Sequence, residues 1–205
     1  MNDFAVWPCA SPSPMRSGSW RPRWIPRGAP FKNIDFGSYK LSLDFSWNPR
    51  RYHYKNIGFG SAVNRGFSVA KGDYLIFLNS DLVLDSKCIG QLVAFLDSDS
   101  NIGGAIPKIL YHDHRDTINS LGVLINYTGI AYPNLLGEKD PLYTETFESA
   151  CGGIFMLRRD VYAAIGGFDE NLFLYHEDHD LSWRIRLAGW KLKVIPNATM
   201  YHHYR

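Results

Sequence analysis

A run of five apolar residues, 74–78, ends abruptly in the polar sequence Asn79-Ser80-Asp81. A short apolar run without alternation is typical of a strand that is buried on both faces, as in a parallel sheet. Ligands of open α/β sheets lie beyond the carboxyl ends of the strands, where Asp81 could hold a hard cation such as Mg²⁺ or Mn²⁺. The spacing alone is equally compatible with a turn that Asp81 merely caps.

Strand and helix patterns alternate through most of the chain. Apolar spacing predicts helices over 62–70, 87–96, 158–165 and 177–188, with glycines at 72, 166–167 and 189 ending three of them. Asp85 or Ser86 is the expected cap of the second helix. Strands are expected at 39–47, 102–110 (broken by Pro107), 123–125, 150–157 and 190–195 (stopped by Pro196). This alternation predicts an α/β fold with a largely parallel central sheet, and 205 residues suit one domain.

The first 53 residues differ in character from the rest. Six prolines within residues 1–30 remove backbone donors and block helices and central strands, which predicts irregular structure there. Residues 1–55 carry nine Lys and Arg against three Asp, a net charge of +6, whereas the remainder carries −4. We therefore predict an irregular basic segment over 1–53 and a core domain over 54–205. A basic aromatic arm that touches a membrane surface or nucleic acid is an alternative for residues 1–30, as is a segment foreign to the native domain start.

Cys9, Cys88 and Cys151 are too few and too widely spaced to indicate a disulfide framework or a zinc site. That usage is typical of reduced thiols in the cytoplasm. No apolar run reaches the roughly 18 residues of a membrane-spanning helix, and the N-terminus lacks the apolar stretch of a signal peptide. We therefore expect a cytoplasmic protein.

Three carboxylates crowd into four positions in Glu177-Asp178-His179-Asp180, at the start of a predicted helix. The helix dipole favours acidic residues in a first turn, and Asp180 with Arg184 forms an (i, i+4) pair, so part of the cluster has a structural explanation. Alternatively, adjacent carboxylates raise the pKa of one member, which suits a general base that deprotonates an alcohol.

Histidines offer further ligands for a metal. His202 or His203 could join Asp81 as a neutral imidazole. A second group, His112, Asp113, His114 and Asp116, could also hold a metal, although a polar turn is the simpler interpretation.

Five blocks, in order and spacing, resemble the family 2 inverting glycosyltransferases with a GT-A fold, in particular the rhamnosyltransferase-like branch. The match covers about residues 54–205. The blocks are Asn56-Ile57-Gly58-Phe59-Gly60 with Asn64; Gly72-Asp73-Tyr74 leading into Leu78-Asn79-Ser80-Asp81; Gly152-Gly153 with Arg158-Arg159; Gly166-Gly167-Phe168-Asp169-Glu170 with Glu177-Asp178-His179-Asp180-Leu181 and Arg184; and Pro196 to His203.

The resemblance implies an enzyme that moves a sugar from a nucleotide-diphosphate sugar to a glycan or lipid-linked acceptor, without nucleic acid. Asp178 would be the catalytic base, with Glu177 orienting the acceptor or tuning that base. Asp81, with His202 or His203, would bind a divalent metal, Mg²⁺ or Mn²⁺. The remaining expected substrate-binding residues are Asn56, Gly58, Asn64, Asn79, Gly152, Gly153, Asp180 and Arg184. Such an enzyme would act at the inner face of the membrane, with peripheral membrane contact.

The resemblance is weakest at the start of the chain. Residues 1–53 do not match the strands that hold the nucleotide in this family, so the domain is expected to lack its N-terminal nucleotide-binding strand. A truncated, non-catalytic remnant that binds a sugar or a partner is therefore the competing hypothesis. The sequence does not specify the donor, the acceptor or the oligomeric state.

Overall fold

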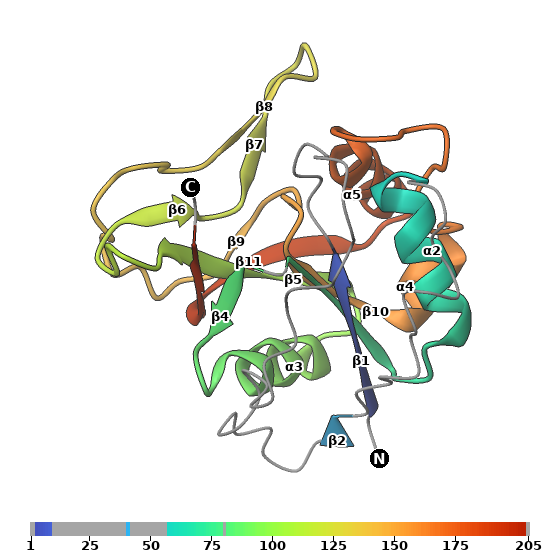
Figure 1. Ribbon diagram of the computed structural model, residues 1–205, viewed down its shortest axis with the longest axis horizontal. Helices are drawn as coiled ribbons and strands as arrows, with labels where there is room; N and C mark the ends of the chain where they lie inside the picture. Colours follow the sequence, from blue (N-terminus) through green and yellow to red (C-terminus); the bar gives the residue numbers. More distant parts are fainter. Residues whose placement is uncertain (1–2, 10–39, 42–56, 80, 204–205) are drawn as a thin grey trace, which may run out of the picture.

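The computed structural model describes residues 3–9, 40–41, 57–79 and 81–203, which include a mixed sheet with helices on both faces (Figure 1). Nine strands of the described ranges form this sheet. Its main path runs β2 (Lys40–Leu41), β1 (Asp3–Cys9), β3 (Tyr74–Asn79), β10 (Phe155–Arg158), β5 (Ile102–Tyr111), β11 (Lys191–His202) and β4 (Leu82–Leu84). β6 (Ile118–Ser120) pairs with β5, and β9 (Phe147–Glu148) pairs with β11.

Most strands of the main path run in one direction. β1 is parallel to β2 and β3, and β5 is parallel to β11. β10 lies antiparallel between β3 and β5, so β3 and β5 point the same way, and β4 is antiparallel to β11. The predicted α/β fold with a largely parallel sheet is confirmed. As a result, β3, β5 and β11 end at the same edge of the sheet, and β10 begins there.

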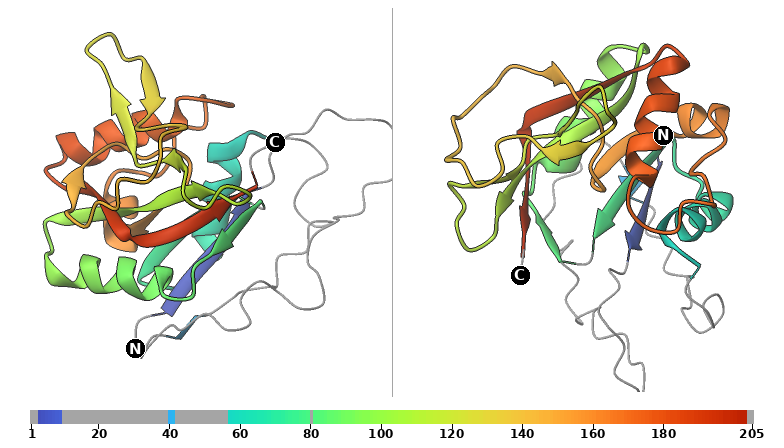
Figure 2. Two further views of the ribbon diagram at one scale, coloured as in Figure 1. Left: turned by 90° about the vertical axis from the view of Figure 1, so that its left-hand side faces the viewer. Right: turned by 90° about the horizontal axis from the view of Figure 1, so that it is seen from above.

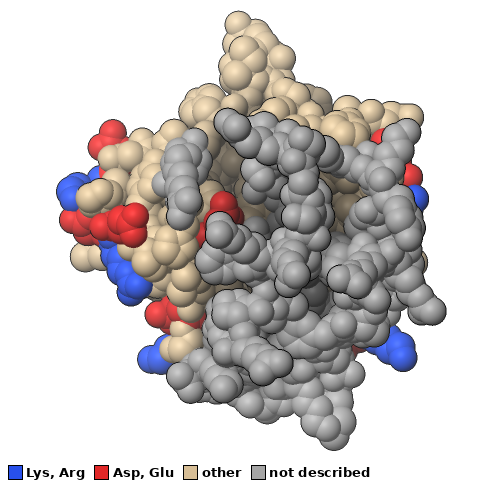
Figure 3. Space-filling view, viewed as in Figure 1, with Lys and Arg blue, Asp and Glu red and all other residues tan. Residues whose placement is uncertain are grey.

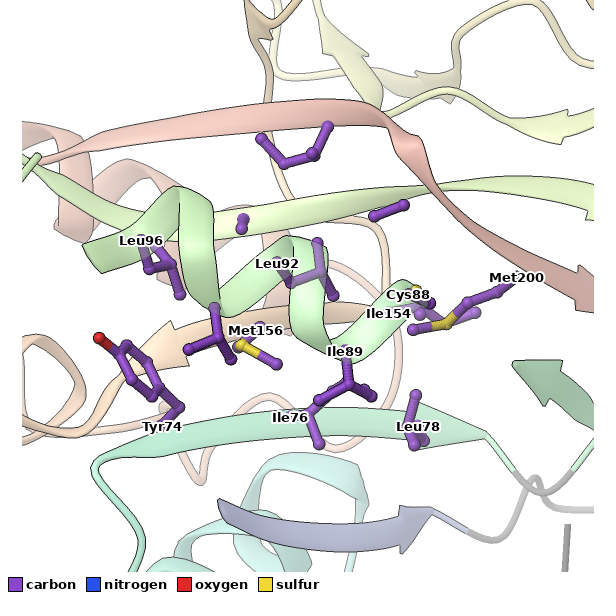
Figure 4. Close-up of a cluster of buried hydrophobic side chains, with 14 of the residues drawn as sticks. Tyr74, Ile76, Leu78, Cys88, Ile89, Leu92, Leu96, Ile154, Met156 and Met200 are labelled. Atoms are coloured by element: carbon purple, nitrogen blue, oxygen red, sulfur yellow. The ribbon is translucent and has the colours of Figure 1, made fainter. Parts of the chain in front are cut away.

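The helices cover both faces of the sheet, as Figures 1 and 2 show. α3 (Cys88–Ser98) packs on one face, and α2 (Phe59–Val69), α4 (Arg159–Ala164) and α5 (Glu177–Leu187) pack on the other. Because successive side chains of a strand point to opposite faces, β3 divides its residues between the two layers. Its residues 74, 76 and 78 contact the α3 layer, shown in Figure 4, whereas residues 75 and 77 contact the α2, α4 and α5 layer.

A small hairpin of β7 (Val123–Ile125) and β8 (Ala131–Pro133) projects from the body of the molecule (Figure 1). Residues 121–136 contain no charged side chain, and the hairpin is the uncharged projection at the top of Figure 3. Tyr127 is fully exposed at its tip, and Ile130 and Tyr132 are also exposed. An apolar surface therefore extends into solvent from this hairpin.

The buried run at 74–78 and the helix at 87–96 are confirmed. All five residues of the run are buried, and the apolar face of α3 is buried at Ile89, Leu92, Val93 and Leu96. Two details of helix ends were wrong. Lys87 rather than Asp85 or Ser86 is the N-cap of α3, although the Asp85 carboxylate accepts a hydrogen bond from the Lys87 N–H. α2 ends at Val69 with an extended Ala70, before Gly72.

The two expected proline interruptions were also wrong. β5 continues through Pro107, and β11 continues through Pro196. The register between these strands shifts after the pair Ile195–Pro107, so the next pair is Thr199–Lys108. Residues 196–198 therefore form an irregularity in β11 where a proline, which has no N–H to donate, disturbs no ladder hydrogen bond.

The prediction of irregular structure for residues 1–30 is wrong at residues 3–9, which form β1. β1 pairs with β3 from Phe4–Tyr74 to Cys9–Asn79. Residues 4–7 are all apolar, and most prolines of this segment come later, at 12–30, so proline density concealed a short strand. Of the strand expected at 39–47, residues 40–41 form β2, and 42–47 lie outside the described residues.

Candidate active site

Asp81 and His202 meet at the edge where β3, β5 and β11 end. Asp81 lies two residues beyond β3, and His202 is the last residue of β11. The His202 Nε2 atom is 3.3 Å from the Asp81 Oδ2 atom. The backbone also connects the two segments, because the His203 N–H donates to the Asp81 carbonyl at 2.9 Å. The structure thus brings together two of the three residues that the sequence suggested as metal ligands.

Asn119, on β6, fixes the orientation of the His202 ring. Its Oδ1 atom lies 2.9 Å from His202 Nδ1, and an amide oxygen only accepts, so Nδ1 carries the proton. Nε2 is then the nitrogen that faces Asp81, and in a neutral imidazole with the proton on Nδ1 it is the nitrogen that can bind a metal. Asn119 is buried and belongs to no motif, so no sequence pattern indicated this role.

The Asp81 carboxylate has an unusual environment. Its Oδ1 atom is buried and has no hydrogen-bond partner in the described structure. Burying a charged oxygen without a partner is unfavourable, and a divalent cation would remove that penalty. A carboxylate oxygen beside an imidazole nitrogen is also a suitable donor pair for such a cation. The residues present therefore fit the expected metal.

His203 points elsewhere. Its ring stacks on that of His112, with ring centroids 3.6 Å apart. The sequence left open which of the adjacent histidines joins Asp81, and the geometry brings His202 there.

Asp178 lies in the first turn of α5 and is largely buried, with 17% of its side chain exposed. Its Oδ1 atom accepts a hydrogen bond from the His179 N–H at 2.9 Å and lies 3.5 Å from His179 Nε2. The Gly153 N–H is close enough to this carboxylate to lower its pKa. Burial nevertheless raises the pKa of Asp178 above its ordinary value, despite the opposing effects of His179 and these N–H groups. A carboxylate with a raised pKa takes up a proton more readily, as a general base must.

Glu177, the neighbouring carboxylate, is 7% exposed. Burial raises its pKa, and the charge of Asp178 adds to that shift. Its Oε2 atom is buried and lacks a hydrogen-bond partner in the described part of the chain. Glu177 therefore contributes little to stability as an anion, although it occupies a helix start that favours negative charge.

Ser182 connects α5 to the segment before β10. Its hydroxyl donates to the Asp178 carbonyl at 2.7 Å and accepts from the Cys151 N–H at 2.9 Å. The side chain is fully buried, so this link joins the first turn of α5 to the glycine pair at 152–153. A lone serine inside a helix carries no pattern, so the sequence did not point to it.

The two glycines before β10 differ in their surroundings. A Cβ atom on Gly152 would lie 2.5 Å from Val123 Cγ2, so this residue allows the β7–β8 hairpin to pack closely. Gly153 has a φ of +74°, and a Cβ atom there would have no neighbour within 4 Å among the described residues. Among the described residues, space therefore lies open beside the residue whose N–H lowers the pKa of Asp178. Because β10 runs opposite to β3, both glycines lie at the edge where β3 ends with the half-buried Asn79.

Arg184 and Asp180 form part of the framework beneath this site. Arg184 Nε and Nη2 both bond Asp180 Oδ2, at 2.9 and 2.6 Å. Its Nη1 donates to the carbonyls of Ile165 and Gly167 at 2.8 and 2.6 Å. The geometry thus supports the structural ion pair that the helix spacing suggested, and it gives no support to a substrate contact by either residue.

Asn64 also bonds within the protein. Its Nδ2 donates to the Phe168 carbonyl and to Glu170 Oε1, and its Oδ1 accepts from the Phe168 N–H and the Tyr162 hydroxyl. Gly58, with a φ of +87°, packs so closely on Phe173 that a Cβ atom would lie 2.7 Å from its carbonyl oxygen. These two residues hold the segment 167–173 in place. Asn56 lies outside the described residues.

Comparison with known proteins identifies the class to which this fold and site belong. The description "Glycosyl transferase family 2" matches residues 43–166, more than half of the chain, and "N-terminal domain of galactosyltransferase" matches residues 137–205. Rhamnosyltransferase WbbL of Escherichia coli K12 is 28% identical over 155 residues, which are 69% of this chain and 57% of that protein. An N-acetylglucosaminyl-diphospho-decaprenol L-rhamnosyltransferase of Mycobacterium tuberculosis is 42% identical over 52 residues, 25% of this chain and 17% of that protein.

Among solved structures, GalNAc-T7 with UDP, GalNAc and Mn²⁺ has a TM-score of 0.61 and 21% identity, covering 82% of this chain and 32% of that chain. This likeness identifies the fold as GT-A. The chain belongs to glycosyl transferase family 2. It spans 57% of the length of WbbL and smaller shares of the other two proteins. In the part of the chain that the structure describes, no helix is long and apolar enough to cross a membrane.

Proposed function

We propose that this chain forms the catalytic core of an inverting glycosyltransferase. It would move a sugar from a nucleotide-diphosphate sugar to a hydroxyl group of a glycan or lipid-linked acceptor. The observation that carries the proposal is the arrangement at one sheet edge. There, one buried Asp81 oxygen, which has no partner among the described residues, lies beside His202 at the same edge as Gly153, whose N–H lowers the pKa of Asp178.

Asp178 is proposed as the base. Its raised pKa suits removal of the proton from an acceptor hydroxyl while that oxygen attacks the anomeric carbon. The proton moves to the Asp178 carboxylate, and the bond between the anomeric carbon and the diphosphate oxygen breaks. One displacement of this kind inverts the anomeric centre and needs no covalent intermediate on the protein.

Asp81 and His202 are proposed to hold a divalent cation, Mg²⁺ or Mn²⁺. When bound, the cation would neutralise charge on the leaving diphosphate. Asn119 keeps His202 in the tautomer that can bind it. The GalNAc-T7 crystal structure holds UDP together with Mn²⁺, which supports this pairing of a nucleotide and a metal.

Glu177 and Gly153 are proposed to shape the acceptor side. The Oε2 atom of Glu177, which has no partner among the described residues, needs a hydrogen-bond donor, and an acceptor hydroxyl is one. Gly153 leaves room beside Asp178 for that hydroxyl. Asn79, at the end of β3, remains proposed as a contact for the nucleotide-sugar.

A lipid-linked acceptor would place the enzyme at the cytoplasmic face of a membrane. The name of the Mycobacterium tuberculosis relative states a decaprenol-linked compound, which supports acceptors of this class. The exposed, uncharged β7–β8 hairpin offers a surface for peripheral membrane contact. We propose that the enzyme acts without a nucleic-acid partner.

The proposal can be tested by measuring the binding of nucleotide-diphosphate sugars to the full chain, with Mn²⁺ and with EDTA, by calorimetry. We expect at least one sugar nucleotide in a broad panel to bind with Mn²⁺ and to lose most affinity in EDTA. NMR of the product formed from that donor should show an inverted anomeric configuration.

Asp160→Asn provides the matched control for Asp81→Asn. Asp160 is an exposed carboxylate on α4, which follows the opposite end of β10. Asp81→Asn should lose Mn²⁺-dependent donor binding, and Asp160→Asn should keep it. If no donor in the panel binds at millimolar concentration, the catalytic proposal fails and a non-catalytic binding role becomes the better explanation.

A further inference from the structure

A second group of metal-ligating side chains lies beside the Asp81–His202 pair. His112 directly follows β5, and His203 directly follows β11. Their rings stack with an interplanar angle of 28°, and the His112 Nδ1 atom is 2.9 Å from Asp113 Oδ1. One ligand atom from each of the three residues lies within 4.8 Å of the others. The polar turn suggested by the sequence therefore brings residues from two distant segments together.

We propose that His112, Asp113 and His203 form a second metal site that selects a zinc-like transition-metal ion. Two imidazoles and one carboxylate are a donor set that binds Zn²⁺ and leaves coordination positions for water. The Asp81–His202 pair offers one imidazole fewer, so it is the better match for Mg²⁺ or Mn²⁺. The two sites would therefore differ in the ions they prefer.

Binding an ion requires the two rings to turn out of their stacked arrangement, because stacked imidazoles direct their in-plane nitrogen lone pairs side by side rather than toward one ion. Zinc bonds to nitrogen and oxygen are about 2.0–2.2 Å long, so donor atoms around one ion lie closer together than the present limit of 4.8 Å. The Asp113 side chain is 82% exposed and His203 is also exposed, so both can rotate without disturbing the core. The backbone bond from His112 to the carbonyl of His202 already places His112 beside His203, which reduces the ordering that binding requires.

Binding at this site would brace the neighbouring one. The His112 N–H donates to the His202 carbonyl at 2.9 Å, and the His203 N–H donates to the Asp81 carbonyl at the same distance. An ion held by His112 and His203 would tie the end of β5 to the end of β11, where Asp81 and His202 lie. The proposal does not depend on the proposed enzymatic function, because it concerns metal binding and stability alone.

The test uses Asp81→Asn protein, so that the neighbouring pair cannot dominate, after all metal is removed with EDTA and the EDTA is then dialysed away. Co²⁺ is added as a spectroscopic probe, and Zn²⁺ binding is measured by calorimetry. We expect one equivalent of each ion to bind and the unfolding temperature to rise with Zn²⁺. Adding His112→Asn or His203→Asn should weaken binding at least tenfold and abolish the rise.

His114→Asn is the control, because His114 is an exposed neighbour outside the cluster. It should leave Co²⁺ and Zn²⁺ binding unchanged. Unfolding temperatures without metal show whether each variant is folded, and either histidine variant suffices if the other fails to fold. The proposal is overturned if both histidine variants bind Zn²⁺ as tightly as the Asp81→Asn protein, or if His114→Asn weakens binding equally.

Discussion

The turn at residues 165–170 and the first turn of α5 belong to one sequence block, yet their polar groups differ in kind. In the turn, the side chains of Arg184 and Asn64 donate hydrogen bonds to backbone carbonyls of residues 165–168. At the start of α5, Glu177 and Asp178 are buried with raised pKa values, and one Glu177 oxygen has no partner in the described residues. The first group stabilises the fold, whereas burial of the second group lowers the free energy of unfolding.

The difference separates framework residues from reactive ones without reference to any motif. A polar side chain whose hydrogen bonds are satisfied within the protein has little left to offer a substrate. A buried carboxylate without full pairing costs stability and is the kind of group that a substrate or an ion can satisfy. One oxygen of Asp81 belongs with the second kind, because Oδ1 is buried without a partner among the residues that the structure describes, although 39% of the side chain is exposed.

The largest expected effect is on the rate of transfer in Asp178→Asn. An amide cannot accept the acceptor's proton, so the rate should fall by about 10²–10⁴-fold. Donor affinity should change little, because Asp178 is assigned to the acceptor. Kinetics and donor calorimetry on the same sample test this, and equal losses of both would mean that the base lies elsewhere.

Removal of a framework residue should act on stability instead. Arg184→Ala leaves the carbonyls of Ile165 and Gly167 and the carboxylate of Asp180 without their partner, so we expect a loss of about 2–4 kcal/mol. Arg186→Ala, an exposed residue in the same helix, should change stability by less than about 0.5 kcal/mol. Urea unfolding measures both, and equal effects would remove the distinction.

The orientation of His202 can be tested through Asn119. Asn119→Ala removes the acceptor that fixes the ring, so the affinity for Mn²⁺ should fall about 10–100-fold. Asn197→Ala, an exposed asparagine on β11, is the control. An unchanged Mn²⁺ affinity in Asn119→Ala would show that Asn119 does not orient a metal ligand.

The smallest effect is expected in Glu177→Gln. Because burial raises the pKa of Glu177, its ionisation opposes folding, and the protein loses stability as the pH rises through the folded-state pKa. The amide should therefore raise the unfolding temperature at pH 7 by about 2–4 °C, the change that roughly 1 kcal/mol produces in a chain of this size. The gain should shrink as the pH falls below about 4, where the carboxyl becomes protonated in the unfolded state as well. A gain that is constant with pH would contradict the assignment.

Local sequence patterns predicted the elements that depend on local physics. The buried run of β3 and the amphipathic α3 follow from the apolar spacing of their own residues. The sequence patterns did not predict β1 or the continuation of β5 and β11 through their prolines, because whether those residues pair depends on a neighbouring strand. The same reason applies to the adjacent histidines His202 and His203. Their rings point in different directions because of contacts with residues 81, 112 and 119, which lie elsewhere in the sequence.

The sequence predicted part of the candidate site, as it predicted part of the fold. Asp81, Asp178 and one of the two histidines follow from the block resemblance and from the rule that strand ends gather ligands. Asn119 and Ser182 are single polar residues that act across 83 and 31 positions of sequence, so no spacing pattern contains them. The substrate-binding roles expected for Asn64 and Arg184 stay predictions, and both side chains bond within the protein, because a motif does not separate residues that hold a site from residues that work in it.

The most direct test of this account is the unfolding free energy of Asp178→Asn at pH 7, compared with that of the native chain under the same conditions. If Asp178 is a reactive group held at a cost, the neutral amide should leave stability unchanged or increase it, even though transfer is lost. A fall in stability comparable to that of Arg184→Ala would contradict the account, because Asp178 would then be a framework residue like Arg184.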